Sequence, residues 1–393
     1  MKNIFNFLKF QDRIGEPPWE YDFLCNLPES EYPKYLKQID IYRTGENLNF
    51  KHPKTFNEKL QWIKLYGVTQ LMRDCTDKVK VRDYVCEKIG EKYLKPVLQI
   101  IGACHSENLE NQNSNSVDFQ VVQNLKEEKS KRSQQAWCHP ELVSGSDIQN
   151  KKMLKHACVN DDIQNKNINH TAVQHDRPLI DFITKSTDVS THFDRINWDK
   201  LPNAFVIKCN HGCKWQYIIK NKEELLNTPK LIEIVKRQIT GWLEQEFWVW
   251  NGFELQYKGI VPVILIEPLL RDEINASARE IEVYCFNGNP KIFVNVKYGE
   301  KREICYYDEN LNNINLILHP DGKNLVISQP ADDITKQTID LSKQLSKNFD
   351  FVRVDWLIYK NKLYFSELTF TPYSGLISFD KKWNLIMGNW IWR

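Results

Sequence analysis

The chain has 393 residues, and 53 basic residues against 51 acidic ones leave a formal net charge of +2. A balance this close excludes an electrostatic grip on nucleic acid, so we expect no nucleic-acid partner. Apolar residues make up 41% of the chain, yet no stretch approaches the roughly 20 apolar residues that span a bilayer. The composition predicts a large soluble enzyme of two or three subdomains.

The first segment, Met1 to Phe10, is basic and apolar but too interrupted for a signal-peptide core. It favours an ordinary N-terminal helix, with a short amphipathic segment on a membrane surface as the alternative. The sequence thus predicts no transmembrane segment and leaves a peripheral membrane contact open. The ten cysteines lack the spacing of a disulfide framework, which indicates reduced thiols and a cytoplasmic location.

Helices are predicted before the first strand. Thr55 and Glu58 form a capping-box pattern, and Phe56 and Leu60 then fall on one helical face. The segment from Asp77 to Lys88 is also predicted to be helical. We therefore expect a helical N-terminal region over residues 1–75.

From about residue 104 to 191 the chain turns polar, and residues 146–151 recur closely as residues 161–166. Such a composition buries too little apolar surface to offset the entropy of ordering. We interpret the segment as an in-frame insertion that loops out. A dedicated partner-binding or lid segment is the competing interpretation.

A basic strand–loop–strand pattern follows. Residues 204–208 form a short apolar strand that ends in Lys208, a loop with His211 and Gly212 comes next, and residues 215–220 read as a second strand. A lysine beside such a loop can hold phosphate groups, although strand-ending lysines are usually just exposed. Further on, a buried strand ends in Glu267.

Near the end of the chain, residues 351–357 and 363–369 predict two strands joined by a polar turn. Side chains alternate between the two faces of a strand, so Arg353 and Asp355 point the same way.

On the second strand Phe365, Glu367 and Thr369 are predicted to share a face. Antiparallel pairing would bring Asp355 beside Glu367. Two carboxylates and a hydroxyl suit a hard cation, whereas the alternative is the solvated face of an amphipathic hairpin.

Taken in order, these elements resemble the ATP-grasp enzymes. More closely, the chain is similar to the TupA-like branch, which is associated with teichuronopeptide and other surface-polysaccharide synthesis. The stretches that carry the resemblance run from about residue 50 to 380 and are Thr55 to Tyr66, Asp77 to Val85, Phe205 to Gly212, Tyr284 to Pro290 and Phe351 to Gly375.

The resemblance implies an α+β ATP-grasp fold in which two α+β lobes clasp ATP. We expect the small lobe over residues 76–265, interrupted by the insertion, and the large lobe with the metal site over residues 266–393. It also implies residue roles. The residues that would bind ATP are Lys78, Lys208, His211, Gly212 and Glu267, with Glu267 at the adenine hinge. Mg²⁺ would be bound by Asp355, Glu367 and Thr369. The catalytic residues would be Arg353, Lys301 and Arg302.

Four positions depart from the family pattern. Thr369 stands where most ATP-grasp enzymes place Asn, Glu282 replaces a lysine, and Cys213 and Lys214 replace small residues. These departures keep ATP binding and favour, as an alternative, a nucleotide-binding protein without turnover.

The activity implied is that of an ATP-dependent carboxylate–amine ligase. It would form an acyl phosphate and join an amino acid to a surface polysaccharide or its precursor, so its substrates would be small molecules or a polysaccharide. The other alternative is a glycosyltransferase of polysaccharide biosynthesis, although the sequence holds no Asp-x-Asp motif for a sugar nucleotide. The sequence does not reveal the oligomeric state.

Overall fold

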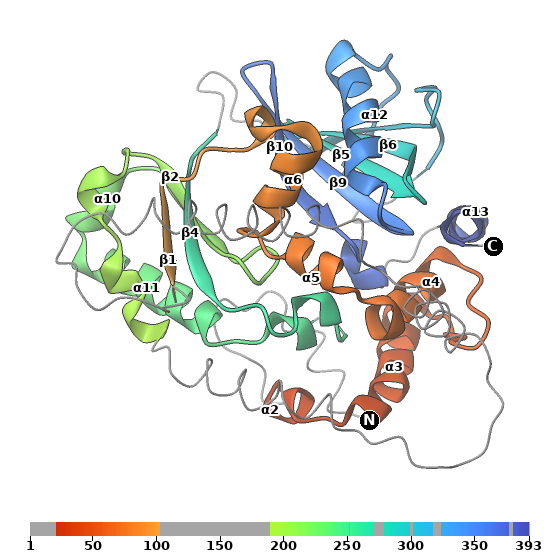
Figure 1. The fold of residues 1–393 in the computed structure, drawn as a ribbon, viewed down its shortest axis with the longest axis horizontal. Helices are drawn as coiled ribbons and strands as arrows, with labels where there is room; N and C mark the ends of the chain where they lie inside the picture. The colour runs from red at the N-terminus through yellow and green to blue at the C-terminus, as the bar shows by residue number, and fades with distance from the viewer. Residues whose placement is uncertain are drawn as a thin grey trace, which may run out of the picture. The chain divides into compact units, whose positions relative to one another are not determined.

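The computed structural model describes residues 21–102, 189–250, 252–270, 279–298, 302–316, 324–376 and 380–392 (Figure 1). Residues 1–10, Lys301 and all but the last three residues of the segment 104–191 lie outside these ranges. The predictions made for them therefore stay predictions. No helix in the described ranges has the length and apolar character needed to cross a membrane.

Helices dominate the described part of the N-terminal region and flank two sheets. Thr55 caps α4 with the expected box: its Oγ1 accepts from the Glu58 amide at 3.2 Å, and Glu58 Oε2 accepts from the Thr55 amide at 2.9 Å. The helices are α2 Tyr21–Cys25, α3 Tyr32–Thr44, α4 Phe56–Trp62, α5 Gln70–Thr76, α6 Val81–Ile89, α10 Lys222–Leu226, α11 Pro229–Leu243, α12 Asp333–Ser346 and α13 Lys381–Ile391.

The first sheet has four antiparallel strands in the order β1-β4-β2-β3. Helix α11 packs on β2 and β3. Its strands are β1 Gln99–Gly102, β2 Phe205–Cys209, β3 Gln216–Ile219 and β4 Val263–Pro268. Strand β4 runs across the predicted lobe boundary between residues 265 and 266, and the division into two lobes stays a prediction.

The second sheet has six strands in the order β10-β9-β5-β6-β7-β8, and only the β7–β8 pair is parallel. Helix α12 covers β5, β6 and β9 (Figure 1). Its strands are β5 Arg279–Phe286, β6 Asn289–Lys297, β7 Arg302–Tyr307, β8 Asn324–Val326, β9 Phe351–Tyr359 and β10 Lys362–Thr369. Helices and mostly antiparallel sheets confirm the α+β prediction.

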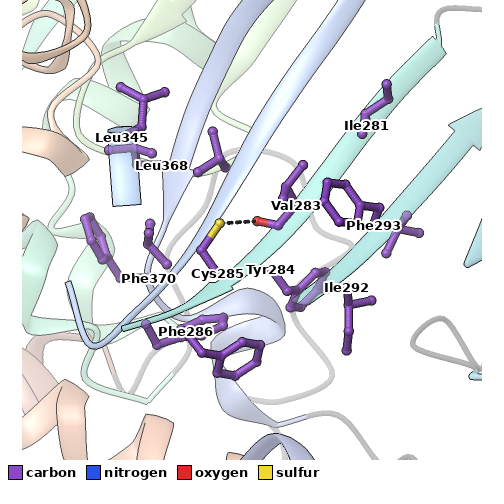
Figure 2. Close-up of a cluster of buried hydrophobic side chains, with 14 of the residues drawn as sticks. Ile281, Val283, Tyr284, Cys285, Phe286, Ile292, Phe293, Leu345, Leu368 and Phe370 are labelled. Atoms are coloured by element: carbon purple, nitrogen blue, oxygen red, sulfur yellow. Dashed lines mark hydrogen bonds between the residues drawn. The ribbon is translucent and has the colours of Figure 1, made fainter. Parts of the chain in front are cut away.

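Strand β5 shows how one sheet serves both a core and a polar face. Ile281, Val283 and Cys285 are fully buried in the apolar cluster of Figure 2. Their neighbours Glu280 and Glu282 point to the opposite face, because side chains alternate along a strand. The core therefore fixes which side of the sheet presents the acids.

A bulge in β10 decides the direction of the second acid. Phe365 pairs with Trp356, whereas Glu367 pairs with Asp355, and the register shifts between Phe365 and Glu367. Phe365 is buried with Trp356 in the core, so the prediction that Phe365 shares a face with Glu367 is wrong. The extra residue, Ser366, turns Glu367 away from the core and toward Asp355.

Candidate active site

A cavity of about 1020 Å³ gathers residues from both sheets and from the N-terminal helices. Most of the residues predicted for the site line it, namely Lys78, Lys208, Glu267, Arg302, Arg353, Glu367 and Thr369. Asp355 lies directly behind this surface, bonded to Arg353 and Thr369. His211 and Gly212 do not line the cavity.

On the four-stranded sheet, one carboxylate serves two lysines. Lys208 on β2 places its Nζ 2.6 Å from Glu267 Oε2, and the Nζ of Lys95 lies 3.4 Å from the same oxygen. All three side chains are nearly buried. Burial alone would raise the pKa of Glu267, but the ammonium groups of Lys95 and Lys208 outweigh it and bring the pKa to about 2. Glu267 is thus firmly ionised.

The loop after β2 is tied to the start of α6. The Lys78 ammonium donates to the Gly212 carbonyl, and the Lys78 amide donates to the Asn210 carbonyl at 3.3 Å. A Cβ at Gly212 would lie 2.4 Å from the Trp215 ring, so only glycine fits there. The first predicted phosphate lysine, Lys78, is therefore held at the loop that follows the second, Lys208.

His211 lies in that loop, but its ring turns toward protein. Its Nε2 is 3.2 Å from the carbonyls of Trp242 and Gln245, a geometry that places the ring proton on Nε2. Burial and the Lys78 charge lower the pKa of His211 to about 4. The neutral imidazole thus anchors the loop to the end of α11, and direct contact with a nucleotide stays a prediction.

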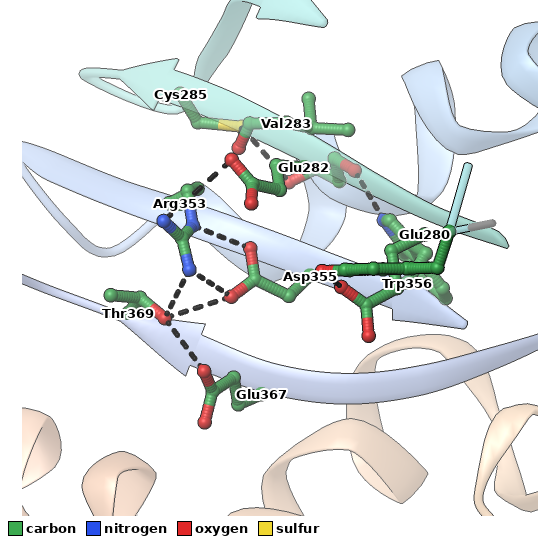
Figure 3. A network of polar contacts seen from close by, with 11 residues as sticks. Glu280, Glu282, Val283, Cys285, Arg353, Asp355, Trp356, Glu367 and Thr369 are labelled. Atoms are coloured by element: carbon green, nitrogen blue, oxygen red, sulfur yellow. Dashed lines mark hydrogen bonds and ion pairs between the residues drawn. The ribbon is translucent and has the colours of Figure 1, made fainter. Parts of the chain in front are cut away.

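On the six-stranded sheet, acids follow one another across three strands (Figure 3). Glu282 on β5 pairs with Asp355 on β9, which pairs with Glu367 on β10. The predicted proximity of Asp355 and Glu367 is confirmed. Glu282 adds a third carboxylate to the row.

Arg353 is the cation of this row. Its Nε and Nη2 donate to the two Asp355 oxygens, both at 2.7 Å, and its Nη1 lies 3.7 Å from Glu282 Oε2. The Thr369 hydroxyl lies 2.9 Å from Asp355 Oδ2 and 3.4 Å from Glu367 Oε1. Burial raises the pKa of Asp355 against the pull of Arg353, and the nearby Glu367 and Glu282 add to the rise.

The loop after β10 closes the same cavity and is held by the N-terminal region. Lys64 is fully buried and its Nζ donates to the carbonyl of Ser374 at 3.0 Å and to its hydroxyl at 3.1 Å. Gln61 Nε2 donates to the carbonyls of Ser374 and Gly375 at 3.0 and 2.8 Å. Tyr373 and Ser374 both have positive φ, 52° and 58°, a conformation that persists only where its surroundings impose it.

Of the two neighbouring residues predicted to be catalytic, Lys301 and Arg302, the structure describes only Arg302. Arg302 begins β7 and lines the cavity, and its guanidinium carbon lies 5.4 Å from the centre of the Tyr298 ring. Tyr298 in turn donates to Glu280 Oε2 at 2.8 Å. Lys301 lies outside the described residues.

Sequence reasoning missed Lys95 and did not count Glu282 among the acids of the site. Lys95 precedes Pro96 in a short apolar stretch and belongs to no recognisable motif. Its one signal is a charge among apolar residues, since a buried lysine is rare unless it is paired. Glu282 stands out in the sequence only because it replaces a lysine of the family pattern. Its place in the row of acids depends on the pairing of β5 with β9.

The sequence profile of the TupA-like ATPgrasp family matches residues 147–392, which is more than half of the chain. The chain therefore belongs to the TupA-like ATP-grasp family, and its fold is the α+β ATP-grasp fold. The match begins within the predicted insertion. It leaves out the N-terminal stretches around Thr55 and Lys78 on which part of the resemblance rested. No curated protein matches the chain.

Solved structures of ATP-grasp ligases are also similar. A D-alanine–D-alanine ligase from Bacillus anthracis is 17% identical, with 44% of this chain and 47% of that chain covered and a TM-score of 0.24. The same enzyme from Helicobacter pylori is 13% identical, with 51% and 52% covered and a TM-score of 0.28. The chain thus spans about half the length of these proteins. At such TM-scores the family assignment rests on the sequence match.

Proposed function

We propose that the chain is an ATP-dependent carboxylate–amine ligase. The observation that carries the proposal is the opposite charge of the two cavity walls. Lys78, Lys95 and Lys208 stand on the side of the four-stranded sheet, and Glu282 and Glu367 stand on the other. Phosphate groups suit the first wall, and a divalent cation suits the second.

The residues present fit Mg²⁺. Asp355, Glu367 and Thr369 offer only oxygen donors, which is the ligand chemistry of a hard cation. Burial raises the pKa of Asp355, and the neighbouring carboxylates of Glu367 and Glu282 add to the rise. A bound cation would stabilise the ionised form of this group. Among the described residues, no three His, Cys, Asp or Glu side chains form a metal cluster by themselves. Asp355 and Glu367 would therefore hold the ion, which would neutralise negative charge on the phosphate groups.

The reaction proposed has two steps. A carboxylate oxygen attacks the γ-phosphorus of ATP, ADP leaves, and an acyl phosphate forms. An amine nitrogen then attacks the acyl carbon, inorganic phosphate leaves, and the amine loses a proton to give an amide. Lys78 and Lys208 would hold the phosphates, and Arg353 would stabilise the negative charge that develops during transfer.

The acceptor we propose follows from the family. An amino acid would be joined to a surface polysaccharide of the cell envelope or to its precursor. We expect the reaction in the cytoplasm, where ATP is supplied. The described cysteines are free, which agrees with a reducing compartment.

A second candidate is a nucleotide-binding protein without turnover. The observation that favours it is the double hydrogen bond between Arg353 and Asp355. A cation bound at Asp355 Oδ2 would have to displace a donor, because that oxygen already accepts from Arg353 Nη2 and from the Thr369 hydroxyl. Within the described residues no observation favours the glycosyltransferase alternative.

The experiment is a screen for ADP release with candidate amino acids and sugar-acid acceptors, run beside a sugar-nucleotide hydrolysis assay. The ligase predicts ADP release that needs both an amine and a carboxylate. ATP binding without ADP release under any combination would favour the second candidate. Hydrolysis of a sugar nucleotide alone would contradict the ligase.

A further inference from the structure

Lys95 is a buried lysine in the cavity wall to which neither the family resemblance nor the proposed mechanism gives a role. It lies between the short helix Glu91–Tyr93 and strand β1. Its side chain is 9% exposed and lines the cavity. Its position is fixed from both sides, because Arg82 Nη2 donates to its carbonyl at 2.9 Å and the Leu98 amide donates to the Ile266 carbonyl at 2.8 Å.

The charges around Lys95 do not balance. Among the described residues, Glu267 is the only acid within ion-pair distance of Lys95 or Lys208. One carboxylate therefore faces two buried ammonium groups, and Arg82 lines the cavity beside them. A buried charge without a counter-charge costs several kcal/mol. The cluster is built for one more anion.

We propose that Lys95 and Lys208 together form a subsite for a phosphate group of the nucleotide. The subsite deepens the proposed function and rests on it. Glu267 keeps the two lysines side by side before the nucleotide binds, and the phosphate supplies the second negative charge. Lys95 is then a third phosphate-binding lysine, in addition to Lys78 and Lys208.

The electrostatics of the free protein agree with a missing anion. Burial and the neighbouring Lys208 lower the pKa of Lys95 to about 8, although Glu267 pulls the other way. The pKa of Lys208 is instead raised, because Glu267 outweighs its burial. Glu267 thus compensates Lys208 well and leaves Lys95 in need of a partner.

Two other roles are distinguishable. An ammonium can donate to an acceptor atom of a purine ring, in which case Lys95 would read the base. It can also serve the fold alone by pairing with Glu267. A probe with phosphates but no base separates these roles from the phosphate subsite.

The experiment measures displacement of a fluorescent ADP analogue, with Mg²⁺ present, by ATP and by inorganic tripolyphosphate. The variants are Lys95→Met, Lys95→Arg and Lys92→Met. Lys92 is exposed and lies three residues before Lys95, so its variant matches the change in net charge. Lys208→Met gives the reference loss for a phosphate lysine.

Lys95→Met should weaken ATP and tripolyphosphate alike, by about tenfold or more, as expected for a lost charge-assisted hydrogen bond. Lys95→Arg and Lys92→Met should stay within about threefold of the unchanged protein. Should Lys95→Met fail to fold, Lys95→Gln beside Lys95→Arg carries the same comparison.

A loss for ATP with unchanged tripolyphosphate would assign Lys95 to the base and overturn the subsite. Unchanged affinity for both probes would leave Lys95 a structural residue and also overturn it. If the unchanged protein does not bind the ADP analogue, the proposed function fails together with the subsite. If the unchanged protein binds the analogue, and Lys208→Met weakens binding while Lys95→Met does not, the subsite alone fails.

Discussion

The two walls of the cavity handle buried charge in opposite ways. On the four-stranded sheet, Glu267 is shared by Lys95 and Lys208. On the six-stranded sheet, the Arg353 guanidinium is bonded to Asp355 and lies near Glu282. The first wall is short of anions, and the second is short of cations.

The pKa values of the carboxyl groups on the two walls reflect this difference. The pKa of Glu267 falls to about 2, despite burial that would raise it, because two ammonium groups lie beside it. The pKa of Asp355 rises through burial and through its acidic neighbours, despite a bidentate guanidinium. A magnesium–nucleotide complex is itself anionic at the phosphates and cationic at the metal, so it would balance both walls at once.

The largest effect is expected where the acidic wall would hold the metal. Glu367→Gln removes one anionic ligand and keeps the side-chain shape, so magnesium-dependent ADP release should fall by more than about a hundredfold. Glu367 is half-buried and pairs with Asp355, so melting should hardly change. Glu303→Gln on β7 of the same sheet is the matched control. Near-normal ADP release by a folded Glu367→Gln variant would sink the metal assignment.

Removing a carboxylate from the basic wall should lower the stability of the fold more than removing one from the acidic wall. Glu267→Gln leaves two buried ammonium groups without their shared anion, and the free energy of unfolding should fall by about 3–5 kcal/mol at neutral pH. Glu282→Gln, which removes one of three neighbouring acids, should change it far less. Denaturant unfolding of both variants measures the contrast. Equal losses would show that the walls do not differ as described.

The pH dependence of stability follows from the same carboxylate. The pKa of Glu267 in the folded protein, about 2, lies below its ordinary value of 4.5. The unfolded chain thus binds the proton first, so the stabilisation is complete above about pH 4.5 and disappears as the pH falls toward 2. Unfolding followed along this range should show a steeper acid loss for the unchanged protein than for Glu267→Gln.

An intermediate effect is expected for nucleotide affinity at alkaline pH. Lys95 has a pKa of about 8 and binds phosphate only when it is charged, so affinity for the ADP analogue should fall between about pH 7 and pH 9. Lys208, whose pKa is raised, and Glu267 keep their charges there, and Arg82 stays charged as a guanidinium. Lys95→Arg should remove the fall. An identical profile in that variant would assign the titration to another group.

The smallest effect is expected at the hydroxyl that joins two acids. Thr369→Val removes hydrogen bonds to Asp355 and Glu367, so ADP release should fall by roughly tenfold or less, in keeping with a loss of about 1–1.5 kcal/mol. Thr369→Asn restores an oxygen donor and should recover most of the rate. A loss as large as that of Glu367→Gln would make Thr369 an essential ligand.

Local sequence pattern predicted the parts of the site that depend on one strand or one hairpin. The alternation in residues 351–357 and the polar turn that follows were enough to bring Asp355 beside Glu367. The bulge at Ser366 was not predicted, because an alternating pattern assumes a regular strand. The face assigned to Phe365 was wrong for that reason.

The remainder of the site depends on contacts that are distant in sequence. Lys95 meets Glu267 only because β1 pairs with β4, and nothing near Lys95 in the sequence announces a partner. Glu282 joins the acidic row only because β5 pairs with β9. His211 sits in the predicted loop, but the carbonyls at the end of α11 that hold its ring follow it by more than thirty residues.

The grip of Lys64 and Gln61 on residues 374 and 375 has a consequence for cooperativity. The left-handed backbone at Tyr373 and Ser374 would relax if the N-terminal region opened, since those residues are held from there. Local unfolding of α4 and the turn after it would then reshape the cavity wall that follows β10, over three hundred residues later in the chain. Hydrogen exchange should report both segments opening with one free energy, as parts of a single folding unit.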